Sequence, residues 1–237
     1  DLNKIITGIQ YDSRKIKPGD IFVCIKGLKS DGHDYIPQAV ENGAAALLVE
    51  HPISTEFSSI TQIVVNDTRK ALALFSSYWF GFPSRKLRMI GVTGTNGKTT
   101  TTHLIKGLLE IKKQRVGLIG TIHNLVGDEE LPATHTTPES LELTELLDRM
   151  VKMNSRTVVM EVSSHALKQN RVAGCEFDVG VFTNLTQDHL DYHPTWEDYL
   201  NSKLILFSRL GQGEKGTAKY AVVNADDQAS GRFIKAA

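Results

Sequence analysis

The sequence predicts an α/β protein in two parts: a small N-terminal α/β domain, then a larger domain built on a parallel sheet. In the larger part, apolar strand-like runs lie at residues 88–93, 115–120, 157–162, 179–183 and 220–224. Helical stretches are expected between most of them, at 98–114, 137–153 and 195–210. Continuous apolar strands that alternate with helices are typical of a parallel sheet covered on both faces. A glycine-rich turn at residues 94–97 joins the first of these strands to a helix, as in phosphate-binding loops.

The first 86 residues show a different rhythm of short strands and short helices. Strands are expected at 20–25, 45–50 and 62–66, and a helix at 33–43. Asp67 or Thr68 can cap a further helix that runs through Phe80. The Gly-Phe-Pro-Ser run at 81–84 breaks that helix. We therefore expect one domain over residues 1–86 and a second over 87–237.

Charge and apolar content limit the classes of partner. The chain has 237 residues, with 27 basic and 27 acidic ones, so its formal net charge is zero. No long-range field favours nucleic acid or an anionic membrane, and neither is predicted as a partner. No apolar run approaches the roughly 18–20 residues that span a bilayer, and no signal peptide opens the chain. These observations predict a cytoplasmic monomer in which Cys24 and Cys175 are free thiols.

The loop at 94–100, Gly-Thr-Asn-Gly-Lys-Thr-Thr, has the strand–loop–helix context of a phosphate site. Glycines let backbone N–H groups face phosphates, and the helix N-terminus adds a favourable dipole. Lys98 can reach the β- and γ-phosphates, and the Thr99 hydroxyl can ligate Mg²⁺. The spacing departs from the usual longer phosphate-loop pattern, because Val92 stands five residues before Gly97. A plain glycine-rich connector is the alternative.

A second cluster follows two later strands. Glu161 ends an apolar run, where doubly wound sheets bind ligands, and is a candidate Mg²⁺ ligand; a simple ion pair is the alternative. The next run leads into Asp188, His189, Asp191 and His193, which look like a metal or catalytic loop. His189 is flanked by the aspartates, which could fix its tautomer.

Lys203 interrupts an apolar helical stripe formed by Trp196, Leu200 and Phe207. A lysine at such a position extends outward to water, forms an ion pair or has a chemical purpose. Partial burial lowers the pKa of an amine. The neutral amine can react with CO₂ to give a carbamate, an anionic metal ligand. The residues alone leave these alternatives open.

These motifs, in this order, resemble the Mur ligases of peptidoglycan synthesis, and most closely the MurE branch. The resemblance covers essentially the whole chain. It rests on Tyr11-Asp-Ser-Arg-Lys, Asp31-Gly-His-Asp, the 94–100 loop, Thr136-Thr-Pro-Glu, Met160-Glu-Val-Ser-Ser-His-Ala-Leu, the 183–193 run and the Lys203 helix. Folylpolyglutamate synthases share the phosphate loop, but the Asp-Ser-Arg and Ser-Ser-His-Ala-Leu segments look like the MurE branch.

The resemblance implies an ATP-dependent ligase that adds a third amino acid, meso-diaminopimelate or L-lysine, to UDP-N-acetylmuramoyl-L-alanyl-D-glutamate through an acyl phosphate. Ser13 and Arg14 would contact the UDP-sugar. ATP would lie on Gly94, Thr95, Asn96, Gly97, Lys98, Thr99 and Thr100. One Mg²⁺ would bind Thr99 and Glu161, and a second His189 and carbamylated Lys203. The muramoyl-dipeptide would contact His135, Thr136, Thr137, Ser163, Gln169 and Arg171.

Two departures from the family pattern accompany the resemblance. His135 stands where relatives usually have Asn, which puts that single contact in doubt. Nothing in the chain corresponds to the C-terminal domain that binds the amino acid; the central domain looks incomplete and the start trimmed. We therefore expect a fragment with little ligase activity alone. There are two alternatives. One is a non-catalytic module that binds a UDP-sugar-peptide and nucleotide, and the other is a generic phosphate-loop kinase or NTPase.

Overall fold

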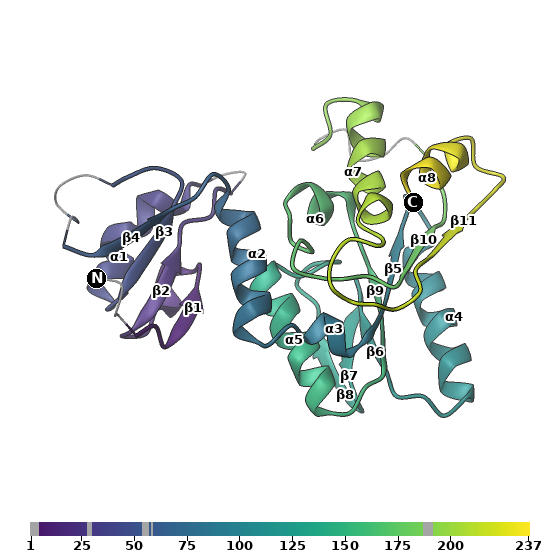
Figure 1. Ribbon diagram of the computed structural model, residues 1–237, viewed down its shortest axis with the longest axis horizontal. Coiled ribbons are helices and arrows are strands. Elements are labelled where there is room, and N and C mark those ends of the chain that lie inside the picture. Colours follow the sequence, from purple (N-terminus) through teal and green to yellow (C-terminus); the bar gives the residue numbers. More distant parts are fainter. Residues whose placement is uncertain (1–4, 28–29, 54–56, 58, 187–191) are drawn as a thin grey trace. The chain divides into compact units, whose positions relative to one another are not determined.

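The computed structural model describes residues 5–27, 30–53, 57, 59–186 and 192–237. They form two compact units, Asp1–Ser76 and Ser77–Ala237. The predicted α/β architecture in two parts is confirmed (Figure 1). No helix of the described residues is long and apolar enough to cross a bilayer.

The division between the units falls earlier than residue 86. Helix α2 (Thr68–Trp79) spans it. Ser77 is the first residue of the second unit, and its hydroxyl donates to the Gly174 carbonyl oxygen (3.0 Å). The expected break at 81–84 is present, since Gly81 and Phe82 have positive φ angles, but Pro83 then starts a short helix, α3 (Pro83–Lys86). Proline suits that place because its φ is already helical and it needs no backbone donor there.

The first unit is a four-stranded parallel sheet in the order β1-β2-β3-β4. Strands β2 and β3 are buried throughout, which matches their apolar sequences. Asp12 and Asp31 cap two short 3-10 helices by accepting backbone N–H groups. The elements are β1 (Gly8–Gln10), η1 (Ser13–Lys15), β2 (Asp20–Val23), η2 (Gly32–Tyr35), α1 (Ile36–Glu41), β3 (Ala46–Val49), β4 (Thr61–Val64) and the start of α2.

The second unit contains a seven-stranded sheet in the order β11-β10-β5-β9-β6-β7-β8. The five apolar runs expected from the sequence form its parallel part, namely β5 (Arg88–Thr93), β6 (Val116–Ile119), β9 (Thr157–Glu161), β10 (Val179–Phe182) and β11 (Tyr220–Val223). Strands β7 (His123–Val126) and β8 (Glu129–Pro132) add an antiparallel hairpin that the sequence analysis missed.

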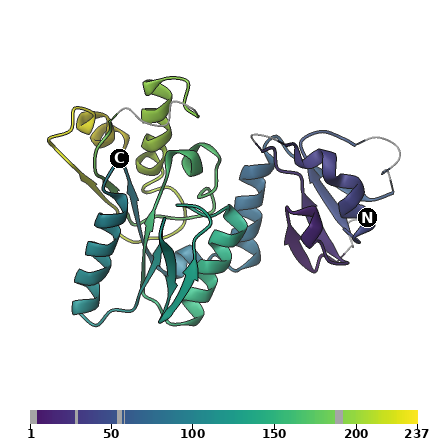
Figure 2. The ribbon, with the colours of Figure 1, turned by 180° about the vertical axis from the view of Figure 1, so that it is seen from behind.

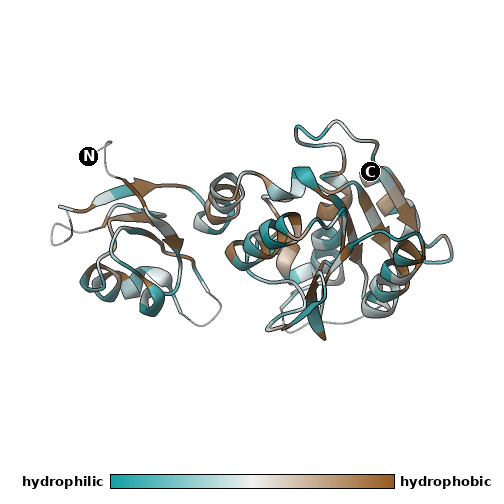
Figure 3. Ribbon diagram, turned by 90° about the horizontal axis from the view of Figure 1, so that it is seen from below, coloured by the Kyte–Doolittle hydropathy of each residue, from teal (hydrophilic) through white to brown (hydrophobic). Residues whose placement is uncertain are grey.

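Helices cover both faces of this sheet (Figures 1 and 2). Helix α4 (Lys98–Ile111) packs Ile105 and Leu109 on one face, against the cluster that contains Val92 and Leu118. The other face packs against α5 (Ser140–Lys152), α6 (Ser164–Lys168), α7 (Trp196–Ser208) and α8 (Ser230–Ala236). In Figure 3 most central strands are brown, whereas the surrounding helices are banded brown and teal. The predicted helices 137–153 and 195–210 correspond to α5 and α7, while α6 was not foreseen.

The parallel arrangement determines where the site forms. Strands β5, β9, β6 and β10 run in the same direction, so their carboxyl ends meet at one edge. That edge carries the 94–97 loop, Glu161, Thr121 and Thr183. The segments that carry polar residues in the sequence are therefore neighbours in space.

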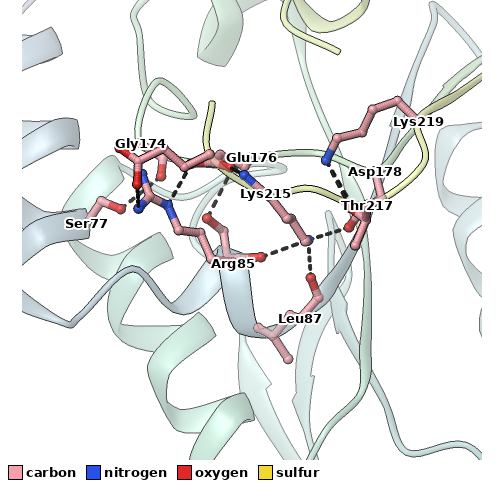
Figure 4. A network of polar contacts seen from close by, with 11 residues as sticks. Ser77, Arg85, Leu87, Gly174, Glu176, Asp178, Lys215, Thr217 and Lys219 are labelled. Carbon is pink, nitrogen blue, oxygen red and sulfur yellow. Dashed lines mark hydrogen bonds and ion pairs between the residues drawn. The ribbon is translucent and has the colours of Figure 1, made fainter. Parts of the chain in front are cut away.

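The amino ends of β5 and β10 are held together by a buried polar network (Figure 4). The Lys215 ammonium donates to the carbonyl oxygens of Ser84 (3.0 Å) and Leu87 and to the Asp178 carboxylate, and Asp178 also accepts the Met89 N–H (2.8 Å). Burial alone would raise the pKa of Asp178, but hydrogen bonds led by that of Lys215 lower it below its ordinary value. The network fixes α3 and the loop before β11 to the sheet.

Candidate functional site

The phosphate loop follows β5 directly and has the backbone that its glycines allow. Gly94 has a φ of +151° and Gly97 a φ of +83°, where L side chains are strained. The end of β10 braces the loop: the Thr95 N–H donates to the Asn184 carbonyl oxygen (2.8 Å), and the Thr183 hydroxyl to the Asn96 carbonyl oxygen (2.8 Å). Helix α4 starts at Lys98, so its N-terminal N–H groups lie next to the loop.

Two lysines converge on one carbonyl oxygen of this loop. Lys98 Nζ donates to the carbonyl oxygens of Gly94 (3.0 Å) and Thr95 (2.8 Å), and Lys203 Nζ donates to Gly94 (2.8 Å). Lys203 is 1% exposed on α7, and its ammonium lies 4.4 Å from the centre of the Tyr199 ring. The alternative that Lys203 extends to solvent is therefore wrong. Trp196 does not share its surroundings, because it is 44% exposed rather than part of a buried stripe.

Thr99 and Glu161, predicted as partners of one metal, lie in contact. Glu161 is 1% exposed at the end of β9, and its Oε1 accepts the Thr99 hydroxyl (3.0 Å) and the Thr121 N–H (3.0 Å). Its Oε2 accepts the Thr121 hydroxyl (3.1 Å). A carboxylate and a hydroxyl supply the hard oxygen ligands that Mg²⁺ prefers, so these residues fit that ion. Thr121 was missed, although it follows a buried strand just as Glu161 does.

The side chains predicted to hold the acceptor form a network beside this pair. The Thr137 hydroxyl donates to the Glu161 carbonyl oxygen (2.9 Å) and accepts the Ser163 N–H (3.1 Å). Arg171 donates to the Thr137 carbonyl oxygen (3.0 Å) and to Gln169 Oε1 (2.7 Å).

Two further threonines and His135 lie at the periphery of this network. Thr136 is linked to it through Thr121, whose hydroxyl oxygen lies 3.0 Å from the Thr136 hydroxyl oxygen. His135 is exposed and lies 3.2 Å from the Thr134 hydroxyl. Thr100 is exposed in the first turn of α4. The structure thus brings Thr136, Thr137, Ser163, Gln169 and Arg171 to the pair formed by Thr99 and Glu161. The exposed His135 would meet only a ligand that extends outward.

A buried histidine links the elements around the site. His193 is fully buried, with Nδ1 2.7 Å from Asp198 Oδ2 and Nε2 2.9 Å from the Ser164 hydroxyl. Burial lowers the pKa of His193 below its ordinary value, and the hydrogen bond to Asp198 offsets only part of this effect. Tyr199, next to Asp198, approaches the Thr95 hydroxyl (3.1 Å). His193 is thus a structural link between α6 and α7. The predicted ligand His189, with Asp188 and Asp191, lies outside the described residues.

The residues predicted for the UDP-sugar lie in the first unit, along a cavity of about 390 Å³. Ser13 is buried and donates to Gln38 Oε1 (2.6 Å), whereas Arg14 is exposed and forms a two-point ion pair with Asp12 (2.8 Å for each bond). Tyr11, from the same sequence motif, also lines this cavity, as do Tyr35 and Gln38, which were not singled out from the sequence.

The two cysteines take no part in either site. Both are free thiols, as expected, and burial raises the pKa of each to about 12, so both stay protonated near neutral pH.

Two family models match the chain. The Mur ligase middle domain matches residues 92–237, and the Mur ligase family catalytic domain matches residues 5–79. These matches cover the phosphate loop and Glu161 in one case and Ser13 and Arg14 in the other.

Similar proteins give the same result over nearly the whole chain. A UDP-N-acetylmuramoyl-L-alanyl-D-glutamate–2,6-diaminopimelate ligase of Bacillus licheniformis is 49% identical over 231 residues, which is 97% of this chain and 47% of that protein. The enzyme of the same name from Clostridium perfringens is 48% identical over 97% of this chain and 46% of its own length. The chain therefore spans about half the length of these curated relatives.

Solved structures resemble the fold. A ligase of the same name superimposes with a TM-score of 0.81 and 31% identity, over 98% of this chain and 45% of the other. A MurF ligase from Thermotoga maritima in complex with ADP superimposes with a TM-score of 0.62 over 99% of this chain and 49% of the other, but at 23% identity it supports the fold alone.

Proposed function

This chain belongs to the Mur ligase family, and we propose that it is the nucleotide- and acceptor-binding half of a ligase that adds the third amino acid to UDP-N-acetylmuramoyl-L-alanyl-D-glutamate. The observation that carries the proposal is the carboxyl edge of the large sheet. There Glu161 accepts the hydroxyl of the phosphate-loop residue Thr99 (3.0 Å), and its own carbonyl oxygen accepts the hydroxyl of Thr137 (2.9 Å). The residues that we assign to the nucleotide and to the acceptor thus belong to one hydrogen-bond network.

The proposed reaction has two steps. An oxygen of the acceptor carboxylate attacks the γ-phosphorus of ATP, the bond to ADP breaks, and an acyl phosphate forms. The neutral amine of the incoming amino acid then attacks the acyl carbon, and inorganic phosphate leaves with the electron pair of the C–O bond while the amine loses a proton. The incoming amine is that of meso-diaminopimelate or L-lysine.

The chain's own residues would orient the reactants. N–H groups of the 94–100 loop and the Lys98 ammonium would hold the ATP phosphates, which requires Lys98 to leave the two loop carbonyl oxygens that it now contacts. Arg171, positioned by Gln169 and Glu139, would face an acceptor carboxylate. Ser13 and Arg14 would hold the UDP-sugar in the first unit.

Mg²⁺ would offset phosphate charge in this site. Thr99 and Glu161 would hold one ion, and we place a second on His189 and a carbamate of Lys203. Gly94 and the Tyr199 ring now surround an ammonium at Lys203, so formation of the carbamate would change the charge beside the loop from positive to negative. A cytoplasmic location and a monomeric state are parts of the same proposal.

Titration calorimetry with Mg²⁺–ADP and the 237-residue chain tests the nucleotide half. We expect Mg²⁺-dependent binding that weakens at least tenfold in Glu161→Gln and in Lys98→Met. Glu145→Gln, an exposed carboxylate in the same unit, should bind as the parent does. Unaltered binding in Glu161→Gln would contradict the assigned metal pair.

Turnover tests the ligase assignment and its alternatives. The 237-residue chain should bind the UDP-muramoyl dipeptide yet add little or no amino acid. Full turnover would refute the proposal that this chain holds only the nucleotide- and acceptor-binding half of the ligase. In the full-length protein, Lys203→Ala should abolish ligation, whereas a generic phosphate-loop NTPase would depend on Lys98 only. Retained activity in Lys203→Ala, without any effect of bicarbonate, would remove the carbamate from the proposal.

A further inference from the structure

The amino edge of the seven-stranded sheet, opposite the phosphate loop, carries a row of arginines. Arg88 is the first residue of β5, and Arg156 and Arg115 directly precede β9 and β6. Their backbones are linked in turn, because the Arg88 N–H donates to the Arg156 carbonyl oxygen (2.8 Å) and the Arg156 N–H to the Arg115 carbonyl oxygen (3.0 Å). Adjacent strands lie roughly 5 Å apart, so three exposed arginines follow one another across neighbouring strands.

Exposed lysines extend this row on both sides. Lys112 and Lys113 follow the end of α4, and Lys86 ends α3. Within the described residues, none of these three lysines or the three arginines forms an ion pair. We call these six residues (Lys86, Arg88, Lys112, Lys113, Arg115 and Arg156) the basic edge.

Acidic groups near the basic edge are few or already paired. Asp178 is buried and accepts hydrogen bonds from Lys215 and Lys219 (Figure 4). Glu129 and Asp148 pair with Arg149 and Lys152, and Asp128 in the β7–β8 turn is exposed. A chain of zero net charge therefore concentrates positive charge on one side of its larger unit.

Exposed aliphatic side chains adjoin the same positive charge. Ile111, directly before Lys112, is 78% exposed, and Met153, whose carbonyl oxygen accepts Arg115 Nη1 (3.2 Å), is 48% exposed. Leu104 and Leu108 are 64% and 65% exposed and continue the line of Ile111 along α4 at helical spacing. In Figure 1, α4 ends on the side of the unit where the chain turns back into β6. Charge and apolar surface thus meet at the end of α4.

We propose that the basic edge, together with Leu108, Ile111 and Met153, is a surface for peripheral binding to an anionic lipid bilayer. Guanidinium and ammonium groups would contact lipid phosphates, and the aliphatic side chains would enter the headgroup boundary. A nucleic acid would use the basic groups but leave the aliphatic ones in water, so a lipid surface accounts for both features. The inference does not rest on the proposed ligase activity.

The zero net charge and the short apolar runs of the sequence predict no membrane partner. Net charge governs long-range attraction, and the length of an apolar run governs insertion across a bilayer. A local cluster acts differently, because its field reaches only a Debye length of roughly 10 Å.

Sedimentation with vesicles tests the proposal on the 237-residue chain. We expect binding to vesicles of phosphatidylglycerol and phosphatidylcholine, weaker binding as salt is raised, and none to phosphatidylcholine alone. Each basic residue near an anionic surface contributes about fivefold, so the triple variant Arg88→Gln, Arg115→Gln, Arg156→Gln should bind about 100-fold more weakly. The triple variant Lys17→Gln, Lys70→Gln, Lys235→Gln removes the same charge from exposed positions elsewhere and should bind as the parent does.

A second pair of variants separates lipid from other polyanions. Ile111→Ser with Met153→Ser should lower vesicle binding and leave binding to a duplex oligonucleotide unaltered. Three results would overturn the proposal: no preference for phosphatidylglycerol, equal loss in both arginine and lysine triple variants, or tighter binding to the oligonucleotide than to vesicles at the same salt. Circular dichroism and urea unfolding of each variant confirm that the fold is retained.

Discussion

Alanine at Gly94 should damage the phosphate loop far more than alanine at Gly97, although both glycines have positive φ angles. At Gly97 (φ +83°) an added Cβ meets nothing within 4 Å. At Gly94 (φ +151°) it would overlap the Thr183 hydroxyl oxygen and lie 3.1 Å from the backbone N and O of Asn184. The two substitutions therefore share backbone strain and differ in steric overlap.

The structure gives a magnitude for each. Strain from a left-handed conformation costs roughly 1–2 kcal/mol, which is the whole effect expected for Gly97→Ala. Gly94→Ala adds overpacking of about 1–3 kcal/mol to strain of about 1–3 kcal/mol, so we expect a loss of about 2–6 kcal/mol. The Thr183 side chain cannot turn away freely, because its hydroxyl donates to the Asn96 carbonyl oxygen (2.8 Å).

Urea unfolding, followed by circular dichroism, measures the free energy of unfolding, and calorimetry with Mg²⁺–ADP measures whether the loop still binds. Thr183→Ala in the Gly94→Ala background removes the overlapping oxygen and should restore part of the lost stability. The contacts to the Asn184 backbone remain, so recovery should be incomplete. If Gly94→Ala costs no more than Gly97→Ala, the steric account of this loop is wrong.

Three further predictions concern the surrounding framework. Lys215→Met should lower the free energy of unfolding by about 3 kcal/mol, and Asp178→Ala should lower it more, because two ammonium groups then lack their carboxylate. The double variant should lose less than the sum of the two. Additive losses in urea unfolding would contradict a coupled buried pair. The lowered pKa of His193 means that the unfolded chain binds its proton more readily, so stability present above the ordinary value of 6.5 should fall as pH drops below it. His193→Asn should not show this loss of stability below pH 6.5. If its free energy of unfolding declined with pH in parallel with that of the parent, the prediction would be refuted. Tyr199→Phe should cost about 1 kcal/mol and weaken nucleotide binding modestly through Thr95, and a change above tenfold would show a larger role than one hydrogen bond.

Much of the fold could be predicted from the sequence because the parallel strands of the second unit are apolar along most of their length. Helices α4, α5 and α7 were also expected within a few residues. The β7–β8 hairpin was missed because its four-residue strands, His-Asn-Leu-Val and Glu-Glu-Leu-Pro, hold few apolar residues, and one buried position of β7 is the polar Asn124. Helix α6, of five residues, is too short for a helical pattern to be visible.

The residues of the candidate site were likewise predictable from the sequence only in part. Local context was enough for the phosphate loop, because a glycine-rich turn between a strand and a helix is itself the structural requirement. Glu161 was found because it ends a buried strand. Thr121 was not, since threonine is common at strand ends and only the Glu161 carboxylate, 40 residues along the chain, gives it a role.

By itself, the sequence determined the two α/β parts, the loop that fits phosphate and the ordered motifs of the Mur ligase family, since each depends on neighbours in the chain. Only the tertiary structure decided that Lys203 is buried on the Gly94 carbonyl oxygen rather than extended to water, a contact across 109 residues. It also decided that three arginines from separate segments form one row at the amino edge. Parallel strands align the ends of distant segments, and the register that does so is a property of the sheet rather than of any one stretch of sequence.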